Sequence, residues 1–153
     1  MKIICPVDSI ALTLDFIPFL AGLPWRASGV RPWDGSYGML AWPFPEPLHS
    51  AAHRLIGQIL SEHFAGHIRG TTFLARLVPG QRVPPHVDAE DHACPFRVHI
   101  PLVTNPQATF TTDLAEFHLS VGHAYLIDPT AEHSAYNGGT TDRIHLLFNV
   151  VPA

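Results

Sequence analysis

Residues 74–88 read LARLVPGQRVPPHVD, and this stretch ends in the triplet His86-Val87-Asp88. A histidine and an aspartate two positions apart on an extended segment project to the same face, because side chains alternate along a strand. An imidazole and a carboxylate therefore lie side by side. One further histidine would complete a metal site of two histidines and one carboxylate with open positions, an arrangement typical of non-haem Fe(II) oxygenases.

The third ligand has one strong candidate, His133, within residues 128–137, which read DPTAEHSAYN. His133 follows His86 by 47 positions, and Arg143 follows His133 by ten. An arginine that faces an apolar interior is an unpaired buried charge, which is costly unless an anion matches it. A dicarboxylate co-substrate would supply that anion through a bidentate contact with the guanidinium. The alternative is an ordinary ion pair between Arg143 and Asp142 or another nearby carboxylate.

The second half of the chain consists of short segments rich in β-branched and aromatic residues, separated by Pro, Gly, Asn and Asp. This texture favours short strands and predicts a mainly β sandwich or barrel. Polar and apolar residues alternate at 97–100 and 143–146, so one strand face would present Arg and His to a cavity. The predicted strands are Thr71–Leu77, Phe96–Val103, Ala108–Thr112, Glu116–Leu119, His123–Ile127 and Arg143–Val151.

The first half predicts a short strand at 2–5, a helix over about 9–21 capped by Asp8 or Ser9, and an irregular stretch at 22–47. Pro18 makes the first helix uncertain. Residues 47–64 form the clearest helix, because one stripe of it is apolar: Leu48, Ala52, Leu55, Ile56, Ile59 and Leu60. The irregular stretch carries five aromatic residues that either pack against the domain or line a substrate mouth, and packing is favoured: Trp25, Trp33, Tyr37, Trp42 and Phe44.

A length of 153 residues predicts a single domain, with residues 1–70 as helical and loop support and residues 71–153 as the β core that carries the site. The net charge of -4 argues against nucleic-acid binding. We expect no membrane partner, because no segment approaches the ~20 apolar residues of a membrane span, and the N-terminus does not read as a signal peptide. Cys5 and Cys94 lack metal or disulfide spacing, which is typical of reduced thiols in a cytoplasmic protein.

A longer series of ordered positions resembles the aspartyl/asparaginyl β-hydroxylase family, which are cupin-type dioxygenases dependent on Fe(II) and 2-oxoglutarate. The resemblance covers residues 71–151 and is far more specific than a lone His-x-Asp motif. Its positions are RLVPG at 76–80, HVD at 86–88, RVHIPL at 97–102, Asn105-Pro106, Gly122, Asp128, His133-Ser134, Asn137 and DRIHL at 142–146.

The resemblance implies a double-stranded β-helix (the jelly-roll or cupin core) with one or two N-terminal helices packed on it. It implies Fe(II) as the metal, with 2-oxoglutarate and O2 as co-substrates. The site residues that it implies have four roles: iron ligands at His86, Asp88 and His133; an anchor for the distal carboxylate of 2-oxoglutarate at Arg143, with Ser134 as support; contacts to the co-substrate's inner end or the prime substrate at Arg97 and His99; and a further pocket residue at Arg76.

Other interpretations stay open at this point. In one alternative, Arg97 and His99 only form a polar face of the sheet and do not contact a ligand. His92, His118, His123 and His145 are expected to be structural or exposed. Two alternatives to a 2-oxoglutarate-dependent dioxygenase are a cupin enzyme that does not use 2-oxoglutarate and a non-catalytic cupin that binds a metal or a small acid. The family name points to an amino acid or a peptidyl residue as substrate, but fold analogy does not transfer substrate choice. No residue decides the oligomeric state.

Overall fold

The computed structural model describes residues 1–27, 38–88, 96–113 and 115–153. Trp33, Tyr37, His92 and Cys94 lie outside these described residues. The helices are α1 (Ser9–Asp15) and α2 (Leu48–His63), with a 3-10 helix η1 at Ile17–Phe19. The strands are β1 (Lys2–Pro6), β2 (Arg26–Ala27), β3 (Gly38–Ala41), β4 (His67–Leu77), β5 (Arg82–His86), β6 (Phe96–Val103), β7 (Ala108–Thr112), β8 (Ala115–Phe117), β9 (His123–Ile127), β10 (His133–Asn137) and β11 (Arg143–Pro152).

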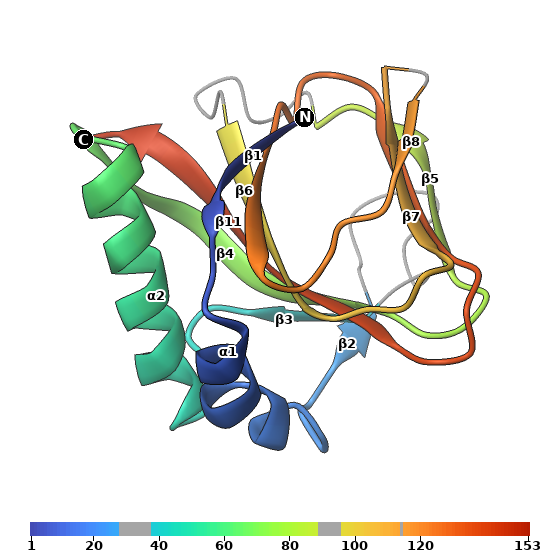
Figure 1. Cartoon of the computed structure of the whole chain (residues 1–153), viewed down its shortest axis with the longest axis horizontal. Coiled ribbons are helices and arrows are strands. Elements are labelled where there is room, and N and C mark those ends of the chain that lie inside the picture. Colours follow the sequence, from blue (N-terminus) through green and yellow to red (C-terminus); the bar gives the residue numbers. More distant parts are fainter. Residues whose placement is uncertain (28–37, 89–95, 114) are drawn as a thin grey trace.

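The strands form two antiparallel sheets that curve toward each other (Figure 1). The larger sheet has seven strands in the order β1-β9-β6-β11-β4-β3-β2, and the smaller has four in the order β5-β10-β7-β8. Strand β11 lies near the middle of the larger sheet, paired with β4 on one side and β6 on the other. This is a jelly roll, so the predicted mainly β core is confirmed.

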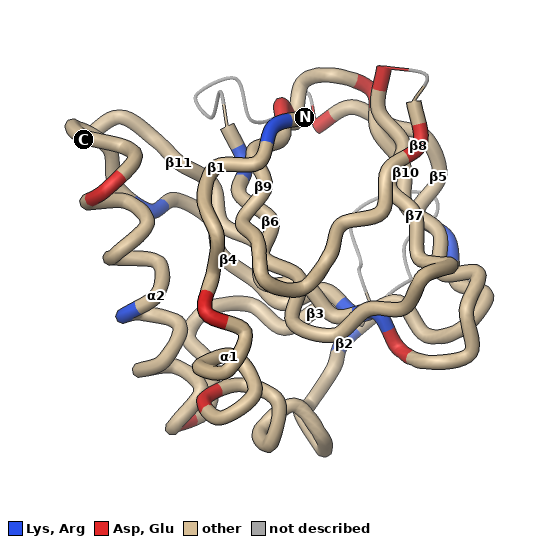
Figure 2. The backbone as a smooth tube through the Cα atoms, viewed as in Figure 1, with Lys and Arg blue, Asp and Glu red and all other residues tan. Residues whose placement is uncertain are grey.

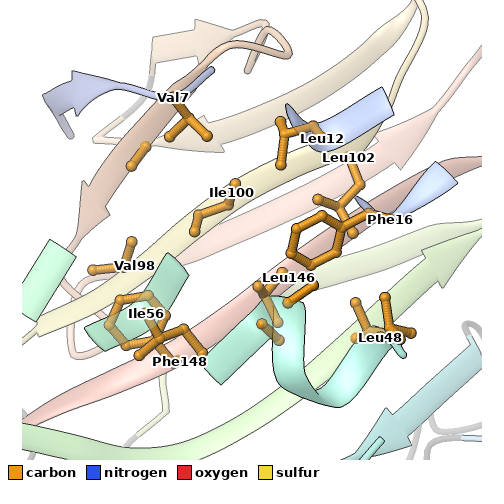
Figure 3. Close-up of a cluster of buried hydrophobic side chains, with 14 of the residues drawn as sticks. Val7, Leu12, Phe16, Leu48, Ile56, Val98, Ile100, Leu102, Leu146 and Phe148 are labelled. Atoms are coloured by element: carbon orange, nitrogen blue, oxygen red, sulfur yellow. The ribbon is translucent and has the colours of Figure 1, made fainter. Parts of the chain in front are cut away.

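The two faces of β11 meet different surroundings. The face toward the helices carries four apolar residues of the main core, Ile144, Leu146, Phe148 and Val150. Figure 3 shows Leu146 and Phe148 in one cluster with Ile56 and Leu48 of α2. Because side chains alternate along a strand, the intervening residues, from Arg143 to Asn149, face the smaller sheet. Burial of each large apolar side chain contributes roughly 1.5–3 kcal/mol. This apolar layer therefore fixes which face of β11 packs on the helices and which faces the smaller sheet.

Helix α2 confirms the apolar stripe read from the sequence. Leu48, Ala52, Ile56 and Ile59 are buried against the larger sheet, and Leu55 and Leu60 pack at the edge of the same cluster. The helix starts directly after Pro47 and ends before Phe64. Glu46 supports the first turn, because its carboxylate accepts hydrogen bonds from the backbone N–H and the hydroxyl of Ser50.

The first predicted helix is shorter than expected. Helix α1 ends at Asp15, and residues 17–19 form the 3-10 helix η1 instead of further α-helical turns. Pro18 explains the break, because a proline lacks the N–H that an α-helix interior requires. Asp8 is the N-cap, and its side chain accepts hydrogen bonds from the N–H groups of Ile10 and Ala11. Both Ile10 and Leu14 are exposed, so only part of the predicted apolar face is buried.

The strand predictions are confirmed for the six segments of the second half, with small differences at their ends, and β1 confirms the strand predicted at 2–5. Strand β4 begins at His67 rather than Thr71, and three strands of the first half extend the larger sheet, namely β1, β2 and β3. Trp25 and Trp42 pack at the edge of the main core and Phe44 lies within it, as the packing interpretation of these aromatics requires.

Charged residues are scattered over the described parts of the chain, as Figure 2 shows, without a continuous run of Lys and Arg along an element. Within the described residues, neither helix is long and apolar enough to cross a membrane.

Candidate metal centre

Two neighbouring strands of the smaller sheet bring the predicted ligands together. His86 ends β5 and His133 begins β10, and the two residues are direct partners in the antiparallel pairing of these strands. Asp88 follows two positions after His86, on the same side of the extended chain. One potential ligand atom of each of the three residues lies within 4.8 Å of the others. The structure therefore assembles the triad from segments 47 positions apart in the sequence.

The backbone fixes the proton position on both imidazoles. Nδ1 of His86 lies 2.7 Å from the carbonyl oxygen of Pro84, and Nδ1 of His133 lies 2.8 Å from that of Ala131. A carbonyl oxygen only accepts, so each Nδ1 carries the hydrogen and donates it. In the neutral imidazole, Nε2 then has the free lone pair, and both Nε2 atoms face Asp88. Metal-binding histidines are commonly oriented by such a second hydrogen bond.

Asp88 is held as a carboxylate within the triad. Its Oδ1 lies 3.6 Å from Nε2 of His86, and its Oδ2 lies 3.3 Å from Nε2 of His133 and 2.7 Å from Nη1 of Arg97. Burial opposes the charge, but a hydrogen bond from His133, when its ring is protonated at both nitrogens, and the positive charge of Arg97 outweigh it and hold the pKa of Asp88 well below its usual range. The backbone N–H of Asp88 donates to Pro129 over 2.9 Å, which fixes the end of this segment beside β10.

The donor set fits a divalent transition metal. Two neutral imidazole nitrogens and one carboxylate oxygen match the facial arrangement that binds non-haem Fe(II) and leaves further coordination positions open. All three side chains are largely shielded from solvent, which favours a cation because the negative charge of Asp88 is poorly hydrated there. Among the described residues, no other group of three such ligands lies close enough to hold a metal.

A buried arginine faces the interior of the same jelly roll. Arg143 begins β11 and is only 6% exposed. No carboxylate among the described residues forms an ion pair with its guanidinium, so the predicted alternative of a pair with Asp142 is not observed there. Burial lowers the pKa of Arg143 to about 9, which still leaves the group charged at neutral pH. Together with His145, Phe110 and Leu119, Arg143 borders a gap between β11 and β7 that is too narrow for a water molecule.

A line of ring side chains connects the triad with this interior. The ring of Phe110 stacks on His133 at 5.8 Å between centroids, and His99 lies 5.6 Å from Phe110. The ring of His99 is 5.7 Å from that of His145, which lies two positions from Arg143 on the same strand face. Burial, followed by the charge of Arg143, lowers the pKa of both histidines well below the ordinary value. Both rings are therefore neutral, so neither histidine adds a second positive charge beside Arg143.

A family model described as aspartyl/asparaginyl β-hydroxylase matches residues 48–152. The chain belongs to the aspartyl/asparaginyl β-hydroxylase family. The match includes α2 and every strand from β4 to β11. The resemblance read from the sequence is thereby confirmed, and it extends further toward the N-terminus than residue 71.

Solved structures show the same fold. An oxidoreductase of the 2OG-Fe(II) oxygenase family from Burkholderia pseudomallei is similar with a TM-score of 0.66 and 14% identity, over 86% of this chain and 74% of that chain. A viral collagen prolyl hydroxylase from Paramecium bursaria Chlorella virus-1, solved in complex with 2OG, has a TM-score of 0.61 and 12% identity, over 96% of this chain and 92% of its own. Identities this low show a shared fold. No curated relative matches the chain.

Six of the eight site residues predicted from the family pattern lie at the triad or face the same interior. His86, Asp88 and His133 come together, and Arg143 and His99 face the same interior. Arg97 also lies at the triad, where its Nη1 donates to Asp88 and its Nε donates to Oδ1 of Asn149.

Two predicted site residues lie elsewhere. Arg76 pairs with Ile144, whose side chain belongs to the helix-facing core, and its guanidinium lies 4.9 Å from the ring centroid of Trp25. Ser134 alternates with the buried residues His133 and Ala135, so its side chain leaves the opposite face of β10. Each of the two residues lies one position out of phase with the inward face of its strand, so their predicted contacts with the pocket stay predictions.

Two buried polar residues at the site were not assigned a role from the sequence. His145 was expected to be structural or exposed, although two positions from Arg143 on the same face; it is 1% exposed and lies against His99. Asn149 is equally buried and binds Arg97. The strand alternation places both on the same face as Arg143, and this is the signal that would have found them.

Proposed function

We propose that this chain is an Fe(II)- and 2-oxoglutarate-dependent dioxygenase that hydroxylates a C–H bond of an amino acid or a peptidyl residue. The observation that carries the proposal is Arg143, a buried cation without a carboxylate partner among the described residues, inside the same jelly roll as a two-histidine, one-carboxylate triad. Membership of the family supports the same activity.

In this proposal His86, Asp88 and His133 hold the iron. The hydrogen bonds from Nδ1 to the carbonyls of Pro84 and Ala131 aim both Nε2 atoms at the metal before it arrives. This orientation lowers the entropic cost of binding, because the rings do not have to be ordered by the metal itself. Asp88 supplies the negative charge that selects a cation.

Arg143 receives the distal carboxylate of the co-substrate. A hydrogen bond to a charged group contributes roughly 1.5–3 kcal/mol, and a buried guanidinium can offer two such bonds to one carboxylate. His99 and His145 are neutral, so they leave Arg143 as the positive charge in this interior. Phe110 and Leu119 lie beside Arg143 as apolar neighbours, and Thr104 and Thr109 line the same gap.

When bound, Fe(II) with 2-oxoglutarate and O2 supplies the oxidation: 2-oxoglutarate becomes succinate and CO2, and one oxygen atom enters the substrate C–H bond. The chain's own contribution is orientation and a dry interior. We also propose that residues 1–153 act as one domain, because α1 and α2 pack on the sheet whose inner face carries Arg143.

The experiment is a turnover assay with Fe(II), 2-oxoglutarate and O2 that follows succinate, run on the wild-type chain and on His86→Ala and His133→Ala. We expect succinate formation from the wild type and its loss in both variants. Ser134→Ala is a matched control, because Ser134 adjoins His133 but faces away from the triad. Retained succinate formation in His86→Ala and His133→Ala would defeat the assignment of the ligands. Metal binding without any succinate from the wild type would favour a cupin enzyme that uses another co-substrate.

A further inference from the structure

We propose that Asn149 is a positioning residue for the metal site: it holds Arg97 in place so that Arg97 fixes the orientation of the ligand Asp88. The inference rests on the proposed function, because it assigns a role relative to the metal that Asp88 binds. It assigns Arg97 to the metal ligand rather than to the co-substrate.

Arg97 joins two partners through different nitrogens. Nη1 donates to Oδ2 of Asp88 over 2.7 Å, and Nε donates to Oδ1 of Asn149 over 2.8 Å. Both distances are short for N–H···O bonds, and the one to Asp88 is charge-assisted. A planar guanidinium that is held at Nε and at Nη1 cannot rotate about its long side chain. Its orientation is therefore set by Asn149 and passed on to the carboxylate.

The orientation of Asp88 matters because its two oxygens have different surroundings. Oδ2 accepts the hydrogen bond from Arg97 and lies 3.3 Å from Nε2 of His133, whereas Oδ1 lies 3.6 Å from Nε2 of His86. The hydrogen bond from Arg97 to Oδ2 therefore sets how the carboxylate of Asp88 is turned toward the two imidazoles, and so how it would meet a metal. Without Arg97 in place, the carboxylate would rotate about its final torsion, which is broad for aspartate.

The fold makes a dedicated place for Asn149. Its partner in the β11–β6 pairing is Arg97 itself, so the two side chains lie opposite each other on the inward face. On its other side, the β11–β4 pairing shifts register between Phe148 and Val150, which places Asn149 at an irregularity of the ladder. Such bulges re-aim side chains near active sites.

Gly70 on β4 leaves the space that Asn149 occupies. A Cβ at position 70 would lie 3.2 Å from Cβ of Asn149 and 3.1 Å from Cγ1 of Val151, which is tighter than ordinary contact. Phe73 of the same strand lies under the guanidinium of Arg97, with 5.9 Å from its Cζ to the ring centroid. The bulge, the glycine and the aromatic ring thus all contribute to the placement of the Arg97–Asn149 pair.

The test measures Mn(II) affinity by calorimetry in the absence of co-substrate and O2, so it does not depend on activity. Asn149→Leu removes the acceptor at similar volume, and we expect its Kd for Mn(II) to rise by about 10- to 100-fold, as for other outer-shell partners of metal ligands. Asn149→Asp keeps an acceptor oxygen and adds negative charge, so it should bind Mn(II) at least as well as the wild type. Arg97→Leu should weaken binding, and the double variant should bind no worse than Arg97→Leu alone.

Phe148→Leu is the matched control for a loss of stability, because Phe148 is buried next to Asn149 but faces the helices. It should lower the melting temperature and leave the Kd for Mn(II) unchanged. Wild-type affinity in Asn149→Leu would overturn the inference, as would equal weakening by Phe148→Leu and Asn149→Leu. If the wild type itself binds no Mn(II) or Fe(II), the proposed function fails and this inference fails with it.

Discussion

Replacement of Arg143 by methionine should make the metal-free and co-substrate-free protein more stable while it abolishes co-substrate binding. The reason is that Arg143 is buried as a charge without a carboxylate partner among the described residues. A residue kept for the fold would have the opposite effect, because its removal would cost stability. The two effects of one substitution therefore separate a binding role from a structural one.

The size of the stabilisation follows from the pKa of Arg143. Burial lowers it to about 9, and one pKa unit corresponds to about 1.4 kcal/mol, so burial of the charge costs the folded protein roughly 5 kcal/mol. Part of this is offset by packing of the side-chain stem and by relaxation. Replacement of buried charged groups by apolar residues of similar volume has stabilised proteins by about 1–4 kcal/mol. For a chain of this length, about 2 kcal/mol corresponds to roughly 4–8 °C in melting temperature.

The assay is thermal unfolding with and without 2-oxoglutarate, in the presence of Mn(II). At a hundred times its Kd, a ligand stabilises the wild type by about 2.7 kcal/mol, and Arg143→Met should show no such increase. Arg143→Lys keeps the positive charge but loses the planar guanidinium that can contact a carboxylate through two hydrogen bonds. It should therefore gain no stability and bind 2-oxoglutarate more weakly than the wild type. Arg76→Met is the matched control on the other strand face and should keep the full ligand response. A lower melting temperature for metal-free Arg143→Met, or an unchanged response to 2-oxoglutarate, would refute the reasoning.

Three further predictions concern pH, the core and the outer face of β10. The pKa values of buried His99 and His145 are lowered, so the unfolded chain binds protons that the folded chain does not. The free energy of unfolding should therefore fall by about 1 kcal/mol for each residue between pH ~6.5 and pH ~5.5. In denaturant unfolding, His145→Phe should lose less stability over this pH range than the wild type, and an equal loss in both would contradict the prediction. Ile56→Ala should cost about 2–5 kcal/mol in urea unfolding but leave the Kd for Mn(II) unchanged, because Ile56 faces the helix-side core. Ser134→Ala should have a Kd for 2-oxoglutarate within twofold of the wild-type value (roughly 0.4 kcal/mol) in calorimetry. A tenfold higher Kd would show that Ser134 does contact the co-substrate.

The sequence predicted those elements whose pattern is local. The apolar stripe of α2 and the six strand segments follow from periodicity, which records how each element is buried. Strands β5 and β10 were not predicted as such. β5 contains Pro84 and Pro85, which cannot donate to a central ladder, but β5 is an edge strand of the smaller sheet and an edge tolerates prolines. β10 reads as polar because its buried positions are His133 and Asn137 as well as an alanine.

The pairing of His86 with Asp88 was predictable from their spacing on an extended segment, whereas His133 was a candidate that only the fold brings beside them. Arg76 and Ser134 lie on the opposite faces of their strands from the triad and Arg143, because a shift of one position along a strand moves a side chain to the other face. Sequence order does not record that phase unless the register is known. The contact between Arg97 and Asn149 joins residues 52 positions apart and depends on the pairing of β6 with β11. Only the folded sheet places these two side chains opposite each other.

The most direct test of the central claim is anaerobic titration of the Fe(II)-loaded protein with 2-oxoglutarate, followed by the weak visible charge-transfer band that this pair gives. The account predicts a band with a one-to-one endpoint in the wild type and its loss in Arg143→Met at the same co-substrate concentration. Iron binding without a band in the wild type would contradict the 2-oxoglutarate assignment. A protein that binds no iron would contradict the metal centre at His86, Asp88 and His133.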